Sequence, residues 1–170
     1  MHILGISASA SMSSSNYYLL EAIKNMVSTQ DEMQILEGLQ EFKLFSPAQL
    51  EKGIPKNVQD FKEEVLAADL IIITTPEYTH NIPAVLKNML EWCTASGEFA
   101  QKAVLPITFT PNEPRGKYAM ISLLNSLQTM KAKIETQLPL YKTDVNALEH
   151  QIELPQDIQE ILQTAINLYR

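Results

Sequence analysis

Serine hydroxyls gather directly after the first apolar run of the chain. The run from His2 to Ser7 is followed by Ala8-Ser9-Ala10-Ser11-Met12-Ser13-Ser14-Ser15-Asn16, and then by a helical pattern. Hydroxyl and amide donors beside the free N–H groups and positive dipole end of a helix suit a terminal phosphate, held without a formal cation. A solvated turn in which a serine or Asn16 caps the helix explains the same residues equally well. The candidate ligands are Ser9, Ser11, Ser14, Ser15 and Asn16.

A second polar loop follows the most apolar run, Leu70 to Thr75, and reads Pro76-Glu77-Tyr78-Thr79-His80-Asn81-Ile82-Pro83. Two prolines stiffen this loop, Tyr78 offers a flat surface, and backbone groups are free for in-plane hydrogen bonds. These properties suit a planar heteroaromatic ligand. A rigid strand-to-helix turn is the alternative, since Pro83 at a helix start accounts for it. For His80 we expect exposure without a catalytic role, because no acid, Ser or Cys at a useful spacing identifies a partner.

A third polar segment, Thr110 to Lys117, follows the apolar run that begins at Ala103. Thr110, Arg115 and Gly116 are its candidate ligand contacts. A guanidinium can pair with a phosphate or with an electron-rich ring edge. The alternative is a proline-stiffened turn with solvated charges.

The sequence lacks the motifs of several other kinds of binding and catalytic site. It has no G-x-G-x-x-G, no P-loop lysine and no G-x-S-x-G, and the first loop lacks the acidic pair of a phosphoacceptor domain. Cys93 is the single cysteine, which excludes an internal disulfide and a Cys-rich zinc site. We therefore assign no catalytic side chain and no metal ligand.

Composition predicts a soluble cytoplasmic protein made of one domain, residues 1–170. The chain is 45% apolar and 19% charged, with a net charge of −7. This acidity argues against nucleic acid or an anionic membrane surface as partner, because both require clustered cations. No apolar run approaches the ~18 to 20 residues that span a bilayer, and the start of the chain reads as a strand rather than a signal peptide.

Apolar runs alternate with helical patterns about five times, which predicts a parallel sheet built from right-handed crossovers. The expected strands are His2–Ser7, Met33–Glu37, Leu70–Thr75, Ala103–Thr110 and a short one near Lys133–Leu140. We expect a doubly wound α/β fold, strand order 2-1-3-4-5, with helices on both faces. In that order the ligand crevice lies at the carboxyl ends of strands 1 and 3, next to the three polar loops.

Smaller features carry further expectations. Lys62-Glu63-Glu64 reads as a solvated helix face, and Cys93 as a small core residue. In the last helix, Ile158, Ile161 and Leu162 are expected to share the buried face. The connection from Gly38 to Asn57 is long for its place and is either an oligomer contact or a loop packed on its own subunit.

Three motifs together resemble the NADPH-dependent FMN reductase family. They are Gly5-Ile6-Ser7-Ala8-Ser9 with Ser14-Ser15-Asn16, then Thr75-Pro76-Glu77-Tyr78, and then Ile82-Pro83-Ala84-Val85-Leu86-Lys87-Asn88. The resemblance is anchored over residues 1 to about 95. It implies a flavodoxin-like fold, bound FMN, NADPH or NADH as electron donor, and a homodimer or homotetramer.

By this resemblance the first loop would hold the FMN phosphate, and Pro76, Glu77, Tyr78 and Thr79 would lie along the isoalloxazine ring. The chain departs from the family at three places. Ser11 stands where the family often has Arg, Thr79-His80-Asn81 replaces Asn-x-Ser, and the segment after Thr110 lacks the family's Gly-rich turn.

The implied function is an FMN-dependent NAD(P)H oxidoreductase. Such an enzyme passes electrons from a reduced nicotinamide through FMN to a small acceptor such as free flavin, a quinone or an azo compound. FMN carries the chemistry, so no catalytic side chain is required. Two alternatives stay open: an electron carrier or flavin sensor that does not turn over NADPH, and a flavodoxin-like domain that has lost FMN and acts through protein contacts.

Overall fold

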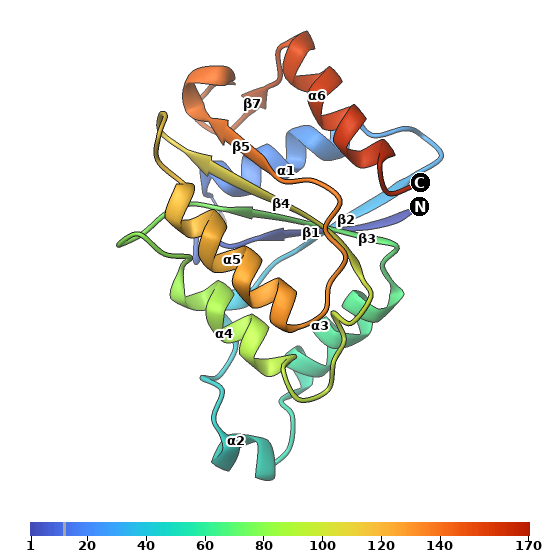
Figure 1. Ribbon diagram of the computed structural model, residues 1–170, viewed down its shortest axis with the longest axis vertical. Coiled ribbons are helices and arrows are strands. Elements are labelled where there is room, and N and C mark those ends of the chain that lie inside the picture. Colours follow the sequence, from blue (N-terminus) through green and yellow to red (C-terminus); the bar gives the residue numbers. More distant parts are fainter. Residues whose placement is uncertain (12) are drawn as a thin grey trace.

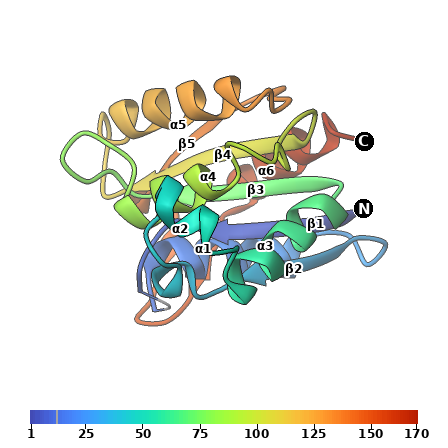
Figure 2. The ribbon, with the colours of Figure 1, turned by 90° about the horizontal axis from the view of Figure 1, so that it is seen from below.

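The computed structural model describes residues 1–11 and 13–170 and contains a five-stranded parallel sheet between two layers of helices (Figure 1). The strand order is β2-β1-β3-β4-β5, which confirms the predicted doubly wound topology. Figure 2 shows the strands side by side in this order. The strands are β1 (His2–Ser7), β2 (Glu32–Leu36), β3 (Leu70–Thr75), β4 (Ala103–Thr110) and β5 (Leu138–Tyr141).

Helices cover both faces of the sheet, as predicted (Figure 1). One face carries α3 (Lys56–Ala67), α4 (Ala84–Trp92) and α5 (Lys117–Thr129). The other carries α1 (Ser15–Met26) and α6 (Gln156–Asn167). Each layer buries its own apolar cluster against the sheet, and Cys93 lies in the first of them, as expected. β3 is buried at all six positions because helices cover it on both sides.

Pro106 lies inside the interior strand β4, although proline cannot donate a ladder hydrogen bond. The Val104 N–H points toward the β5 side, where it donates to Lys133 O at 2.8 Å. The position of Pro106, two residues later, faces the same side. Pairing with β5 begins only at Ile107, so Pro106 falls in the gap between the Lys133 bridge and β5. This gap also corrects the predicted start of β5 from Lys133 to Leu138.

Several short elements lie between the main ones and were not predicted. They are the 3-10 turns η1 (Leu39–Glu41) and η2 (Lys142–Asp144), the helix α2 (Pro47–Glu51) and the strands β6 (Asn146–Ala147) and β7 (Ile152–Glu153). The long connection after Gly38 packs on its own chain. Asn88 Nδ2 and Trp92 Nε1 both donate to Lys43 O, at 3.1 and 2.8 Å, whereas Leu44 stays 79% exposed.

Two expectations about helix faces are wrong at one residue each. Lys62 is 6% exposed and pairs with the equally buried Glu98, with Nζ and Oε1 3.2 Å apart. A lysine therefore lies on the inner side of α3, where only a partner from another segment makes its burial tolerable. Ile161 is 45% exposed, because the buried stripe of α6 runs through Ile158, Leu162 and Ile166 instead.

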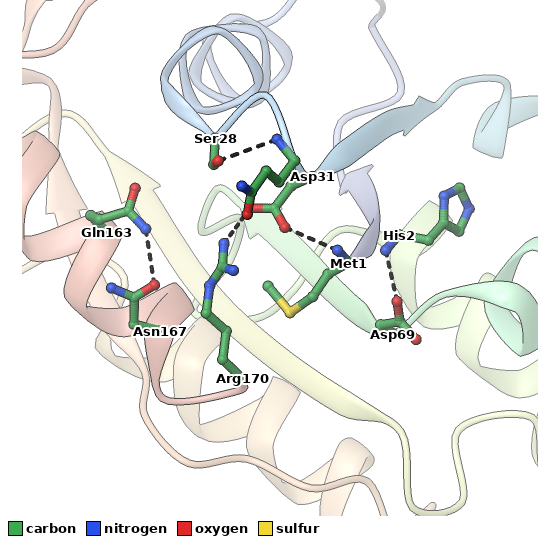
Figure 3. A network of polar contacts seen from close by, with 9 residues as sticks. Met1, His2, Ser28, Asp31, Asp69, Gln163, Asn167 and Arg170 are labelled. Atoms are coloured by element: carbon green, nitrogen blue, oxygen red, sulfur yellow. Dashed lines mark hydrogen bonds and ion pairs between the residues drawn. The ribbon is translucent and has the colours of Figure 1, made fainter.

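Both chain ends lie at the amino ends of the strands, opposite the predicted crevice (Figure 1). Asp31 accepts from the Met1 ammonium at 2.9 Å and also pairs with Arg170, as Figure 3 shows. Burial disfavours the Asp31 charge, but the ammonium hydrogen bond and the Arg170 charge outweigh it and hold the pKa of Asp31 below its usual value. One carboxylate thus joins the first and last residues of the chain.

Within the described residues, every helix is too short or too polar to cross a membrane.

Candidate functional site

The three polar loops meet at the carboxyl ends of β1, β3 and β4, at the left of Figure 1. Direct hydrogen bonds tie the ends together. Ala8 N donates to Thr74 O at 2.9 Å, and Thr74 Oγ1 donates to Asn16 O at 3.1 Å. Asn16 Nδ2 in turn reaches Phe109 O at 3.4 Å. The first helix therefore begins against the ends of β3 and β4, at the expected crevice.

The first loop presents hydroxyl groups around the start of α1. Ser14 is the N-cap residue, and its Oγ accepts from Tyr17 N at 3.1 Å. Ser14 Oγ also lies 3.5 Å from Ser7 Oγ, so these two hydroxyls share a hydrogen bond in which either can donate. Ser9 Oγ accepts from Ser11 N at 3.2 Å, so the loop partly orders itself. The N–H groups of Ser15 and Asn16 open the helix, where no carbonyl of the helix can reach them.

Asn16 is the most constrained of the predicted phosphate ligands. Its side chain is buried, and its Oδ1 has no hydrogen-bond partner among residues 1–11 and 13–170. Because a buried unpaired acceptor is costly, Oδ1 requires a donor from elsewhere. A ligand hydroxyl meets that need, whereas a phosphate oxygen does not. Asn16 is therefore better suited to a polyol chain than to the phosphate itself.

Negative charge lies beside the first loop, on the β2 side. The Glu21 and Glu37 carboxylates share the single Tyr17 hydroxyl proton, each with an oxygen 3.2 Å from Oη. Partial burial, reinforced by these two carboxylates, raises the pKa of Tyr17 to about 12, so the phenol stays protonated at neutral pH. Attraction for an anion must therefore come from the donors of the loop and the helix end.

The second loop is a tight hairpin turn. Tyr78 and Asn81 exchange two backbone hydrogen bonds, of 3.0 and 2.9 Å. Between them, Thr79 and His80 both have positive φ, of 49° and 56°, a conformation that non-glycine residues seldom adopt. The turn leaves Tyr78 57% exposed, three residues after the end of β3.

Glu77 braces this turn against the start of α5. Its Oε2 accepts from the backbone N–H groups of Tyr118 and Ala119, at 2.9 and 3.0 Å. The N-cap residue of α5 is Gly116, which offers no side-chain cap, so a carboxylate 41 residues earlier takes that role. Glu77 was predicted to lie along the ligand ring, but the cap is a structural use for its carboxylate.

Two further contacts fasten the second loop to α5. The His80 and Tyr118 rings stack with centroids 4.5 Å apart and planes inclined by 26°. Ser122 Oγ donates to Asn81 Oδ1 at 2.6 Å. Sequence reasoning missed this brace. The only local signal was a helix that starts without Ser, Asp or Asn and so needs a distant cap.

The third loop is shaped by packing on β4. Gly116 has φ +99°, and a Cβ there would lie 3.0 Å from Thr108 Oγ1 and 3.2 Å from Thr110 Cγ2. Glycine at this position is therefore explained by the strand beneath it. Thr110 Oγ1 donates to Arg115 O at 3.0 Å and anchors the loop. The Arg115 side chain is exposed and points to no protein partner that the described residues provide.

Known proteins share this sequence pattern and fold. A subunit of the NADH:(hydroxy)cinnamate reductase of Vibrio ruber is 33% identical over 98 residues, 58% of this chain and 48% of that protein. An NAD(P)H-dependent FMN reductase of Pseudomonas aeruginosa is 29% identical over 96 residues, 56% of this chain and 51% of that protein. The chain thus spans about half the length of these curated relatives.

A solved structure resembles nearly the whole molecule. The NAD(P)H:(acceptor) oxidoreductase FerB of Paracoccus denitrificans superimposes with a TM-score of 0.83, covering 99% of this chain and 94% of that one. The identity is only 17%, so this likeness shows the flavodoxin-like fold alone. The model of one family, described as NADPH-dependent FMN reductase, matches residues 1–153. The chain belongs to the NADPH-dependent FMN reductase family.

Proposed function

We propose that the chain is an FMN-dependent oxidoreductase that takes electrons from NADPH or NADH and passes them to a small acceptor. One observation carries this proposal: a hydroxyl-rich helix start and a braced aromatic turn follow the carboxyl ends of the neighbouring strands β1 and β3, in a chain of this family. The crevice offers donors for a phosphate at one side and an exposed flat ring at the other.

The residues present fit FMN, with a different group of residues for the phosphate, the ribityl chain and the ring. Ser9, Ser11, Ser14 and Ser15, with the first N–H groups of α1, would hold the phosphate. Asn16 Oδ1, buried and unpaired within the described chain, would accept from a ribityl hydroxyl. Pro76, Tyr78 and Thr79 would lie along the ring, with Glu77 as the brace that fixes them. Thr110, Arg115 and Gly116 would close the site from the third loop.

FMN, when bound, supplies the ability to accept a hydride and to release electrons. The protein contributes position and charge. The turn at Thr79 and His80 is held rigidly on α5, so a ring lying on it would meet a fixed surface rather than a mobile loop. The exposed Arg115 guanidinium can approach negative charge at the crevice, where the first loop provides only neutral donors.

The phosphate assignment can be tested with flavins that differ only in the phosphate. We expect the native chain to bind FMN more tightly than riboflavin. Ser9→Ala with Ser15→Ala should weaken FMN binding by about 1–3 kcal/mol and leave riboflavin binding nearly unchanged, because the lost donors serve a charged group. Fluorescence titration measures both affinities. Ser28→Ala, in a turn at the far end of the sheet, is the control.

If the double variant binds FMN as the native chain does, the first loop does not hold the phosphate. If the native chain binds neither flavin, the alternative of a flavodoxin-like domain without FMN replaces the proposal. Binding of FMN without reduction by NADPH or NADH would instead favour an electron carrier or flavin sensor.

We further propose that residues 1–170 form one FMN-binding domain, that it acts in the cytoplasm, and that it assembles as a homodimer or homotetramer. The family resemblance supports the assembly, and the reduced nicotinamide donor supports the location. The exposed Leu44 in the long connection offers an apolar contact point for a neighbouring subunit. Light scattering during size-exclusion chromatography gives the mass, and a purely monomeric native chain would contradict the assembly.

A further inference from the structure

A pair of carboxylates lies next to the loop that is predicted to hold the phosphate. Glu21 belongs to α1 and Glu37 directly follows β2, and an oxygen of each lies 3.2 Å from Tyr17 Oη. One small hollow is lined by Glu37 and Tyr17 together with Ser9 and Ser11 of the loop. Its volume of about 10 Å³ has room for about one water molecule, so the carboxylate and the loop hydroxyls are close neighbours.

The negative charge of this pair is not offset from the β2 side. Neither carboxylate forms an ion pair with any residue that the structure describes. The sequence has no Lys or Arg before Lys24, in the last turn of α1, and the next is Lys43. Burial, reinforced by both carboxylates, raises the pKa of Tyr17 to about 12, so its proton stays in place and the pair keeps its charge.

This charge bears on which form of a phosphate the loop can hold. A phosphate monoester carries one or two negative charges near neutral pH, because its second pKa is about 6. The helix start has a second mark of a ligand, the buried Asn16 Oδ1, which has no partner within residues 1–11 and 13–170. A ligand phosphate there lies close to two carboxylates, and they repel its dianion more than its monoanion.

We propose that Glu21 and Glu37 make the predicted phosphate site selective for the singly charged phosphate of FMN, so that FMN binds more tightly at lower pH. The phosphate pKa is then higher in the complex than in free FMN. The added affinity is therefore present below about pH 6 and is lost as pH rises through the raised pKa. This inference rests on the proposed FMN site.

Three other charged groups lie around the pair and have to be separated from it. Glu41 belongs to η1 in the segment after Glu37 and adds to the negative charge. His150 lines a groove together with Glu21, and a histidine gains its charge in the same pH range as the phosphate. Arg115 belongs to the third loop, on the β4 side, and a cation there would favour the dianion instead.

The test measures FMN and riboflavin affinity by fluorescence titration from about pH 5.5 to about pH 8. We expect FMN to bind roughly 3- to 5-fold more tightly at the acidic end. Riboflavin affinity should stay constant, and this comparison removes any effect of pH on the ring contacts, including those of His80. Phosphorus NMR of bound FMN should show its phosphate titrating above about pH 6.

Matched variants identify the groups responsible. Glu21→Gln with Glu37→Gln keeps oxygen acceptors for Tyr17 and removes both charges. This double variant should bind FMN roughly 3- to 5-fold more tightly at about pH 8 and lose most of the pH dependence. Glu32→Gln with Glu160→Gln makes the same change in net charge at two exposed positions, at the amino end of β2 and on α6, and should leave FMN binding unchanged.

The possible failures are distinguishable. FMN affinity that is constant or rises with pH would overturn the inference and leave the proposed FMN site standing, as would equal effects of the two double variants. Loss of the pH dependence in His150→Gln would overturn it in favour of that histidine. No FMN binding at any pH would overturn the proposed function together with the inference.

Discussion

Glu77 has a larger structural part than its place in a ligand-binding motif suggests. Its carboxylate satisfies two N–H groups at the start of α5 and so joins the second loop to the third. A carboxylate at a helix amino end is favoured both by hydrogen bonding and by the helix dipole. The flat surface offered by Tyr78 therefore depends on a residue that need not touch the ligand.

Glu77→Gln should lower the free energy of unfolding by about 1–2 kcal/mol, since an amide oxygen is a weaker acceptor and carries no charge. Urea denaturation measures this change. Glu91→Gln, which loses only an exposed pair with Lys87 on α4, should change stability by less than about 0.5 kcal/mol. Equal effects of the two variants would show that the brace contributes little.

Tyr78 and His80 are neighbours in the turn but differ in what holds their rings. The His80 ring is already stacked on Tyr118, whereas the Tyr78 ring is exposed. Tyr78→Ala should therefore weaken FMN binding by about 0.5–1.5 kcal/mol, and His80→Ala by less. Flavin fluorescence titration ranks the two variants. The opposite ranking would give His80 a direct role at the ring.

At the scale of elements, the turn between β3 and α4 stores backbone strain. Thr79 is β-branched and has φ 49°, a conformation that costs roughly 1–2 kcal/mol for an L residue. Strain of this kind persists where surrounding contacts enforce it, and here three contacts to α5 do so. The turn geometry is thus held by α5 rather than by local sequence preference.

Thr79→Gly should raise the free energy of unfolding by about 0.5–1 kcal/mol, because glycine adopts positive φ without steric conflict. Thr79→Ala removes the same side-chain atoms beyond Cβ but keeps the conflict, and should show no such gain. Chemical denaturation of both variants tests this. If the alanine variant gains as much as the glycine variant, backbone strain is not the cause.

The helix α3 carries two ion pairs that differ in burial. Lys62 pairs with Glu98 in the interior, and Lys56 pairs with Asp60 at the surface. Lys62→Ala should lower the free energy of unfolding by about 3–5 kcal/mol, since it leaves the Glu98 charge buried and unpaired. Lys56→Ala should cost less than about 1 kcal/mol. Similar effects in urea denaturation would mean that the buried pair is solvated in solution.

The sheet was predictable because its long inner strands are apolar runs that can be recognised locally. Uninterrupted β-branched runs such as Leu70 to Thr75 indicate strands buried on both faces. Their alternation with helical patterns indicates a parallel sheet, for which 2-1-3-4-5 is a common doubly wound order. The burial of Lys62 and the cap by Glu77 were not predictable. Both depend on partners 36 and 41 residues away, and nothing in the local pattern names those partners.

The candidate site was predictable only as a set of loops. The order of the strands indicated which loops would meet, and the structure brings them together. It also gives individual residues distinct tasks: Ser14 caps α1, and Gly116 fits against Thr108. Such tasks follow from tertiary contacts. The contact of each predicted residue with FMN therefore stays a prediction, which the variants above test.

At the scale of the whole molecule, the two ends of the sheet have different uses. The carboxyl ends of the strands carry the crevice, and the amino ends carry the contacts of Met1, Asp31 and Arg170 (Figure 3). Asp31 is nearly inaccessible, with its side chain 1% exposed, and it joins the start and the end of the chain. Its ionisation therefore bears on global stability more than on the site.

Low pH should weaken the contacts that Asp31 makes with Met1 and Arg170. The pKa of Asp31 is lower in the folded chain than its ordinary value of 3.8, so its contribution is fully present above that value and is lost as pH falls through the folded pKa. Asp31→Asn should lower stability by about 1–2 kcal/mol near neutral pH and by progressively less in acid. Urea denaturation from about pH 7 to about pH 3 measures this. A constant difference across that range would contradict the assignment.

The central claim is that this crevice binds FMN and lets a reduced nicotinamide reduce it. Its most direct test is an anaerobic absorbance titration of the purified chain with FMN, followed by NADPH and then NADH in the same cuvette. We predict saturable binding and loss of the flavin absorbance band at a rate that free FMN does not show. Saturable binding with no bleaching by either nicotinamide, or no binding at all, would contradict it.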